Sequence, residues 1–208
     1  QTLVLFLQNG MGAESFLLQE KPYLTMLHGI TTDGVFRKNT DELVLAGLGE
    51  TWIGAQNEPH TDAAKQLVQE LAAIHPRTFF ANDILQRRWL KLAINCVINP
   101  LTAIYRCRNG EILHVPEIAA LLQPLCHELA EVMQAEGIEI TEQQLRDHVV
   151  STAQKTAANI SSMHADILAR RLTEIHFMNG FIIAHAQQHK LSVPLNNELF
   201  HKICALTA

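Results

Sequence analysis

The chain has 208 residues, of which 48% are hydrophobic and 18% are charged. This length suits one large domain or two small ones, and the composition excludes an intrinsically disordered protein. The formal net charge is −5 and the lysines and arginines are scattered. These features argue against a general nucleic-acid-binding protein, which normally carries a basic face.

The sequence carries no sign of a membrane or secreted protein. It has no apolar run of about 18 residues, the length that a membrane-spanning helix needs. Its four cysteines form no CxxC pair, and no secretory signal precedes the first strand. We therefore expect a cytoplasmic protein with reduced thiols.

The first segment, residues 2–7, is a continuous apolar run typical of a strand buried on both faces. Such a strand needs neighbours on both sides, and few later segments could supply them. We therefore expect the chain to begin inside a domain. A glycine-bearing turn, residues 8–12, follows at the strand's carboxyl end, which is where open α/β sheets bind ligands.

The remaining elements divide the chain into two parts. Residues 1–82 read as mixed α/β, and from residue 83 a 3.6-residue period takes over and predicts helices throughout. In the first part we expect a helix at 13–20, an apolar stretch at 24–27, strands at 42–46, 51–54 and 78–81, and a helix at 61–74. In the second part we expect helices at 83–105, 117–136, 142–158, 162–189 and 195–207.

One polar stripe interrupts the apolar helix expected at 83–105. Lys91, Asn95, Asn99 and Thr102 share one helix face, while the residues around them are almost all apolar. A buried amide without a partner costs about 1–3 kcal/mol, so the stripe is expensive if it is only structural. It could be a solvent-facing edge, but asparagine is a poor helix former, which favours a functional role.

The residue types in this stripe indicate proton transfer. Partial burial lowers the pKa of a lysine, which can then donate a proton to a carbonyl oxygen as negative charge develops there. The asparagine amides could hold the oxygens of a substrate. Pro100 removes the helical hydrogen bond to the carbonyl of Cys96 and tends to bend the helix beside Asn99.

Three further patterns have structural and functional interpretations. Ser161 and Ser162 precede a helix, so one is expected to cap it, and the exposed N–H groups there could bind a carboxylate. Glu174 lies near Arg170 and Arg171, and the pattern alone favours an ordinary helical ion pair. His185 and His189 have the i, i+4 spacing of metal ligands, but no third ligand lies nearby, and we expect no metal site.

Five ordered motifs resemble the ketopantoate reductase (2-dehydropantoate 2-reductase) family along essentially the whole chain. They are Gln8-Asn9-Gly10-Met11-Gly12, the run from Arg88 to Ala103, Asn109-Gly110-Glu111, Asn159-Ile160-Ser161-Ser162-Met163, and Thr173-Glu174-Ile175 with Asn179-Gly180.

The resemblance implies a fold and an activity. The fold would be a partial Rossmann-like NADP-binding domain over residues 1–82, followed by an all-helical substrate-binding domain over residues 83–208 that is similar to the C-terminal domain of 6-phosphogluconate dehydrogenase. The activity would be reduction of 2-dehydropantoate to (R)-pantoate with NADPH, in pantothenate and coenzyme A synthesis. The partners would be a small 2-keto acid and, in a homodimer, a second copy of the chain.

The resemblance also implies roles for single residues. Lys91 matches the proton donor and a substrate contact. Glu174 matches a cofactor contact, in place of the ion pair that the pattern favours, and Val35 falls near a backbone contact to the cofactor. The implied substrate contacts are Asn9, Asn95, Asn99, Asn109, Asn159 and Ser162, and Asn9 would also touch the cofactor. Thr102 receives no role.

The sequence departs from the family pattern in one respect: it contains no GxGxxG phosphate loop, and Gly47-Leu48-Gly49 does not supply one. We therefore expect part of the dinucleotide-binding domain to be absent. Two other functions stay open. One is reduction of another 2-keto acid, and the other is a catalytically inactive helical module for interaction or dimerisation.

Overall fold

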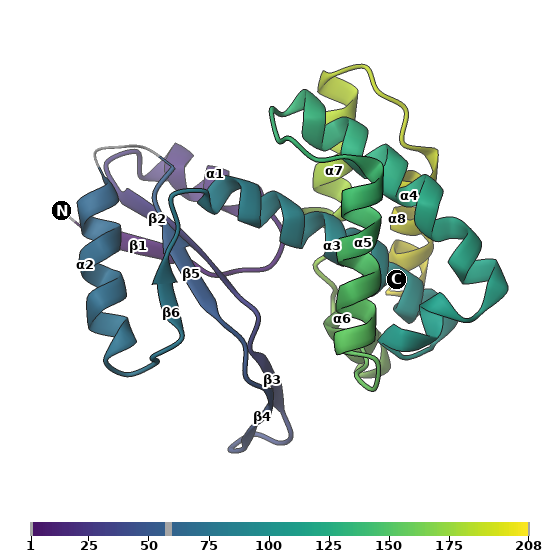
Figure 1. Cartoon of the computed structure of the whole chain (residues 1–208), viewed down its shortest axis with the longest axis horizontal. Helices are drawn as coiled ribbons and strands as arrows, with labels where there is room; N and C mark the ends of the chain where they lie inside the picture. The colour runs from purple at the N-terminus through teal and green to yellow at the C-terminus, as the bar shows by residue number, and fades with distance from the viewer. Residues whose placement is uncertain (1, 57–59, 208) are drawn as a thin grey trace. The chain divides into compact units, whose positions relative to one another are not determined.

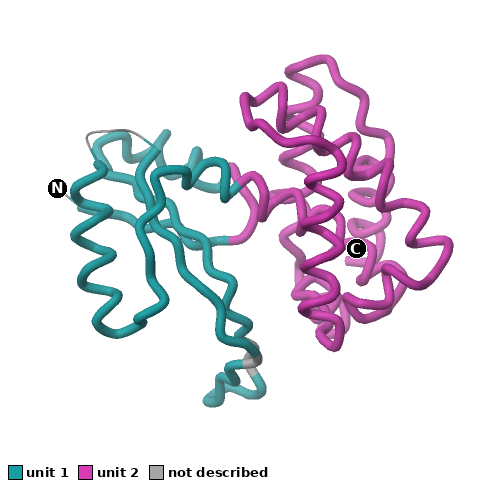
Figure 2. The backbone as a smooth tube through the Cα atoms, viewed as in Figure 1, with its two compact units in different colours: residues 1–8, 13–88 teal, residues 9–12, 89–208 magenta. Residues whose placement is uncertain are grey.

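The computed structural model describes residues 2–56 and 60–207, without the side chains of residues 36, 37 and 46. The chain forms two compact units (Figure 2). Unit 1 consists of residues 1–8 and 13–88, and unit 2 consists of residues 9–12 and 89–208. The short segment Asn9–Gly12 therefore belongs with the helices of unit 2, although it lies near the start of the chain.

Unit 1 is built on a four-stranded mixed sheet (Figure 1). Its strands lie in the order β1 (Leu3–Phe6), β2 (Thr25–Thr31), β5 (Thr51–Gly54) and β6 (Thr78–Phe80). Strands β1 and β2 are parallel, β2 and β5 are antiparallel, and β5 and β6 are parallel. A separate antiparallel hairpin joins β3 (Gly34–Arg37) and β4 (Leu43–Gly47).

Helices α1 (Ala13–Glu20) and α2 (Thr61–Ala72) complete unit 1. Ala64 and Val68 share one face of α2 because they are four residues apart, and they meet Leu27 and Ile53 of the sheet in a small core. This contact places α2 against β5 and β6.

The prediction that the first strand is buried on both faces is wrong for the part of the chain that the structure describes. Strand β1 pairs there with β2 alone, and its Leu3 is 39% exposed. An edge strand has a neighbouring strand along one edge only, so its side chains lack the neighbours that a second strand would place beside them, which fits the exposure of this run.

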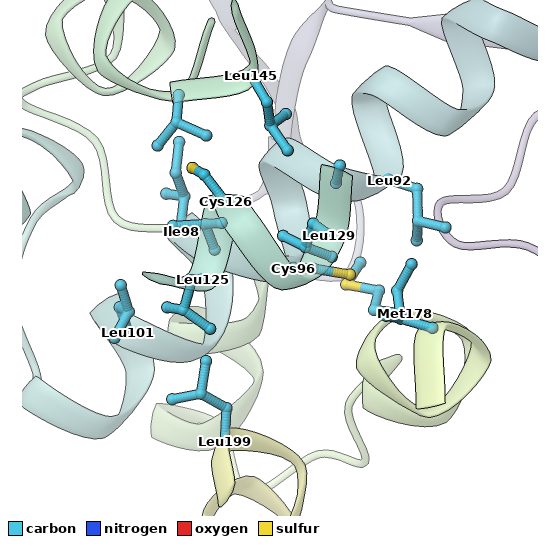
Figure 3. Packing of buried hydrophobic residues seen from close by; sticks show 14 of the residues in the cluster. Leu92, Cys96, Ile98, Leu101, Leu125, Cys126, Leu129, Leu145, Met178 and Leu199 are labelled. Atoms are coloured by element: carbon cyan, nitrogen blue, oxygen red, sulfur yellow. The ribbon is translucent and has the colours of Figure 1, made fainter. Parts of the chain in front are cut away.

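Unit 2 is all-helical and surrounds α3 (Ile84–Tyr105), which begins in unit 1. The other elements are η2 (Asn109–Leu113), α4 (Pro116–Ala135), α5 (Glu142–Lys155), α6 (Ser162–Leu168), η3 (Ile175–Phe177), α7 (Asn179–Gln188) and α8 (Pro194–Leu206). Figure 3 shows Leu92 and Cys96 of α3 packed with Leu129 of α4 and with Met178. These residues are at most 2% exposed, which confirms that α3 is central and buried.

The continuous helix expected over 162–189 is wrong, since the chain leaves α6 after Leu168 and starts α7 at Asn179. Arg170 has a φ of +53°, in the left-handed region that often ends a helix. The backbone N–H of Arg171 donates to the carbonyl of Asp166 at 2.8 Å, and the backbone N–H of Arg170 donates to the carbonyl of Ile167 at 3.0 Å. These two hydrogen bonds form the Schellman motif of a helix C-terminus. Glu174 consequently lies in the connection and not on a helix.

The architecture confirms the predicted fold class, a mixed α/β region followed by an all-helical region. Within the described residues, no helix combines the length and the apolar character that crossing a membrane requires.

Candidate active site

Helix α3 presents the predicted polar residues one turn apart. Lys91, Asn95 and Asn99 are separated by four residues each, so they line one face of the helix. Lys91 and Asn95 are partly buried, and Asn99 is only 7% exposed. A solvent-facing edge therefore does not explain Asn99.

The turn Asn9–Gly12 packs against the segment before α7. A Cβ at position 10, where φ is +76°, would lie 2.4 Å from the carbonyl oxygen of Phe177, so only glycine fits there. The amide of Met11 donates to the same carbonyl at 2.9 Å. These contacts place Asn9 beside Glu174, whose carboxylate accepts a hydrogen bond from the Asn9 side chain.

Lys91 and Glu174 form an interacting pair of titratable groups. Burial lowers the pKa of Lys91 below its ordinary value, and the charge of Glu174 partly offsets this effect. Burial raises the pKa of Glu174, whereas the hydrogen bond from Asn9 and the charge of Lys91 lower it. The structure thus brings Lys91, Glu174 and Asn9 together, with the pKa of the lysine moved in the expected direction.

A second link joins α3 to the start of α6. The hydroxyl of Thr102, which is fully buried, lies 2.7 Å from Oγ of Ser161. Ser161 caps α6, because its Oγ accepts from the amide of His164 at 3.1 Å. Ser162 is the first residue of α6 and is exposed. Thr102, to which the sequence assigned no role, therefore holds the Asn159–Ser162 segment on α3.

Asn109 joins this segment from another side. The backbone N–H of Asn109 donates to the carbonyl of Asn159 at 3.0 Å. Its side-chain Nδ2 donates to Oγ1 of Thr156 at 2.9 Å. Thr156 gives its single hydroxyl proton to the carbonyl of Thr152 at 2.7 Å, so it can only accept from Asn109. This fixes the orientation of the Asn109 amide and leaves its Oδ1 as a buried acceptor without a hydrogen-bond partner.

All but one of the predicted site residues lie in unit 2. Val35 lies in unit 1, on β3, and is 55% exposed. Asn159 and Ser162 are also exposed. A hollow of about 400 Å³ in unit 2 lies at the turn between α7 and α8, and none of the predicted residues lines it.

The two histidines considered as metal ligands share a carboxylate instead. Nδ1 of His185 and Nε2 of His189 lie 2.6 and 2.8 Å from the same oxygen of Glu136. Over residues 2–56 and 60–207, no group of three or more His, Cys, Asp or Glu side chains has a geometry that could hold a metal ion.

The donor set beside Lys91 fits the polar end of a nicotinamide cofactor. An asparagine amide and a carboxylate can hydrogen-bond the carboxamide and the ribose hydroxyls of such a group. The sequence offers no glycine-rich loop at a helix start for the diphosphate.

Comparison with known proteins agrees with this combination of a mixed sheet and a helical unit. A family model described as "Ketopantoate reductase PanE/ApbA C terminal" matches residues 83–206, and one described as "Ketopantoate reductase PanE/ApbA" matches residues 1–58. The chain belongs to the ketopantoate reductase PanE/ApbA family, a family of oxidoreductases.

Two curated relatives illustrate the similarity. The chain is 36% identical over 208 residues to the 2-dehydropantoate 2-reductase of Vibrio cholerae, covering 99% of this chain and 69% of the relative. It is 38% identical over 202 residues to the enzyme of Shigella flexneri, covering 97% and 64%. The chain thus spans about two thirds of the length of these relatives.

Two solved structures share the fold. A D-mandelate dehydrogenase bound to NADH and anilino(oxo)acetate matches with a TM-score of 0.92 at 23% identity, covering 99% of this chain and 68% of that one. At this identity the match shows the fold alone. A dimeric ketopantoate reductase from Staphylococcus aureus matches with a TM-score of 0.82 at 25% identity, covering 99% and 68%.

Proposed function

We propose that the protein reduces 2-dehydropantoate to (R)-pantoate with NADPH, as a step of pantothenate and coenzyme A synthesis. One observation carries the proposal: Lys91 is partly buried, its pKa is lowered, and it interacts with a glutamate that Asn9 hydrogen-bonds. Membership of the ketopantoate reductase family supports the same reaction. The four cysteines are free thiols, which suits work in the cytoplasm.

Lys91 is the proton donor in this proposal. A general acid is most effective when its pKa lies near the working pH, and burial moves the pKa of Lys91 in that direction. Reduction of the keto carbon places negative charge on its oxygen, and the ammonium group of Lys91 neutralises that charge by giving up a proton.

The asparagines and Ser162 hold the substrate. Asn95 and Asn99 lie one and two turns along the same helix face as Lys91, so their amides can bind oxygens of the bound keto acid. The exposed Asn159 and Ser162, at the start of α6, can bind its carboxylate. The Oδ1 of Asn109 has no hydrogen-bond partner in the structure, and as an acceptor it can bind a donor such as the hydroxyl group of the substrate.

Asn9, Glu174 and Val35 would contact the cofactor, NADP(H), which supplies the hydride when it is bound. Asn9 would contact both cofactor and substrate. The proposal of NADPH over NADH rests on analogy with the family alone. The residues that choose between the two cofactors do not belong to the site described above.

The test is to assay a panel of 2-keto acids by NADPH oxidation, using the complete gene product. The matched control substrate is 3,3-dimethyl-2-oxobutanoate, which differs from 2-dehydropantoate only by lacking the 4-hydroxyl group. An unpaired buried acceptor costs about 1–3 kcal/mol, so we expect kcat/KM for the control to be lower by about fivefold to 150-fold.

A second candidate is reduction of a different 2-keto acid, because a shared fold does not fix the substrate: a D-mandelate dehydrogenase has this fold as well. An aryl 2-keto acid turned over faster than 2-dehydropantoate would select this candidate. A third candidate is a catalytically inactive interaction or dimerisation module, which reduction of none of these 2-keto acids together with self-association in solution would favour.

A further inference from the structure

Pro100 leaves one carbonyl group of α3 without its helical partner. A proline has no N–H, so the carbonyl oxygen of Cys96, four residues earlier, receives no hydrogen bond from within the helix. Cys96 is completely buried, so water cannot replace the missing donor. A buried carbonyl requires another partner.

Asn179 supplies that partner. It is the first residue of α7 and is completely buried, and its Nδ2 donates to the carbonyl oxygen of Cys96 at 3.1 Å. The side chain of Asn179 therefore stands in for the backbone N–H that Pro100 lacks.

A polar chain through the core fixes the orientation of this amide. The carboxylate of Glu128, on α4, accepts from the backbone amides of Leu195 and Asn196 and from Nδ2 of Asn196 at 2.8 Å. Asn196 must therefore offer its Oδ1 to Nδ2 of Asn179, at 2.9 Å. The same NH2 group of Asn179 is then directed at Cys96.

This link lies at the centre of the proposed site. Cys96 stands between Asn95 and Asn99 on α3, and Nδ2 of Asn99 contacts the sulfur of Met178 at 3.8 Å. Met178 directly precedes Asn179, and both follow the segment that carries Glu174. Met178 and Asn179 thus hold the segment that carries Glu174 on α3, close to Pro100.

We propose that Asn179 is a positioning residue of the active site: by bonding the carbonyl that Pro100 leaves unpaired, it fixes the α3 backbone between Asn95 and Asn99 against the Glu174 segment. The expected effect of Asn179 on kcat rests on the proposed function. The link between Asn179 and the carbonyl of Cys96 rests only on the contacts described above.

The structural part is tested by a double-mutant cycle on the full chain. Pro100→Ala restores the N–H, so Asn179→Ala should lower the urea midpoint of unfolding strongly in the natural sequence and clearly less in the Pro100→Ala background. Asn197→Ala, which removes a similar amide on α8 that bonds Val193, should have the same effect in both backgrounds. Equal losses for Asn179→Ala in both backgrounds would overturn the proposal.

The positioning role is tested by rescue of activity. Asn179→Ala should lower kcat by about tenfold to a hundredfold, as expected for a misplaced catalytic group, and adding Pro100→Ala should recover most of the loss. Recovery of stability without recovery of kcat would show a merely structural role and overturn the proposal. If Asn179→Ala does not fold, the double variant must fold, and its failure counts against the proposal.

A readout without turnover separates this proposal from the proposed function. The titration of the Lys91 side chain, followed by NMR, depends on burial and on Glu174. Asn179→Ala should shift this titration, Pro100→Ala should reverse the shift, and Asn197→Ala should leave it unchanged. If the protein does not reduce 2-dehydropantoate, this titration still decides the role of Asn179, and an unshifted titration rejects it.

Discussion

At the scale of single residues, the interaction between Lys91 and Glu174 makes the pH dependence of the reaction predictable. In the proposed reaction, Lys91 donates its proton only when it is charged, so activity should be lost as the pH rises through its pKa. Glu174 raises that pKa. Glu174→Gln removes this effect, and the alkaline limb of the kcat profile should move to lower pH.

The profile is measured by NADPH oxidation over a range of pH, with Glu139→Gln as the control because Glu139 is an exposed carboxylate. An unchanged alkaline limb in Glu174→Gln would show that Glu174 does not influence the proton donor.

The sequence locates these residues unequally. Lys91, Asn95 and Asn99 stand out because polar residues at four-residue spacing are rare on a buried helix. Glu174 could not be placed from its neighbours, since Arg171 pairs with Asp166 and Glu174 interacts with Asn9 and Lys91, both distant in sequence. Asn179 belongs to one of the family motifs, but no pattern predicted a role for it, because its hydrogen bond to the carbonyl of Cys96 joins residues 83 positions apart.

At the scale of elements, the start of α6 separates a structural serine from a proposed binding serine. Ser161 caps the helix and contacts Thr102, so Ser161→Ala should lower the free energy of unfolding by about 1 kcal/mol or more. Ser162 is exposed, so Ser162→Ala should change that free energy by less than about 0.5 kcal/mol while raising KM for the keto acid.

Urea unfolding and steady-state kinetics on the two variants provide the comparison. Equal destabilisation by both substitutions would contradict the assignment of the cap, and an unchanged KM in Ser162→Ala would contradict the binding role.

Helix boundaries could be predicted where the sequence carries a chemical signal, and not elsewhere. Pro116 and Pro194 begin α4 and α8 close to the expected positions. The end of α6 depends on Arg170 in a left-handed conformation, which arginine rarely adopts, and no glycine or proline marks it. The predicted helix therefore continued through the connection that places Glu174.

At the scale of the whole molecule, the chain should bind the cofactor weakly. Asn9 and Glu174 fit the nicotinamide end, but the sequence has no GxGxxG loop for the diphosphate. Calorimetric titration of the 208-residue chain with NADPH should show weak or no binding. Tight binding would show that other residues of this chain hold the diphosphate.

The division into an α/β part and a helical part could be predicted because the period of the apolar residues changes near residue 83. The sheet order could not, since an apolar run does not show which strand it pairs with. The antiparallel pairing of β2 with β5 and the edge position of β1 depend on tertiary contacts. Assignment of Asn9–Gly12 to the helical unit depends on contacts with Phe177 and Phe181.

The central claim is that Lys91 protonates the substrate, and the most direct measurement is kcat for 2-dehydropantoate in Lys91→Ala, with the protein as its gene encodes it. We expect a loss of about 10²–10⁴-fold, the usual contribution of a general acid, with unfolding by urea little changed. Lys155→Ala, at an exposed lysine of α5, should keep normal turnover. Near-normal turnover in Lys91→Ala would contradict the account.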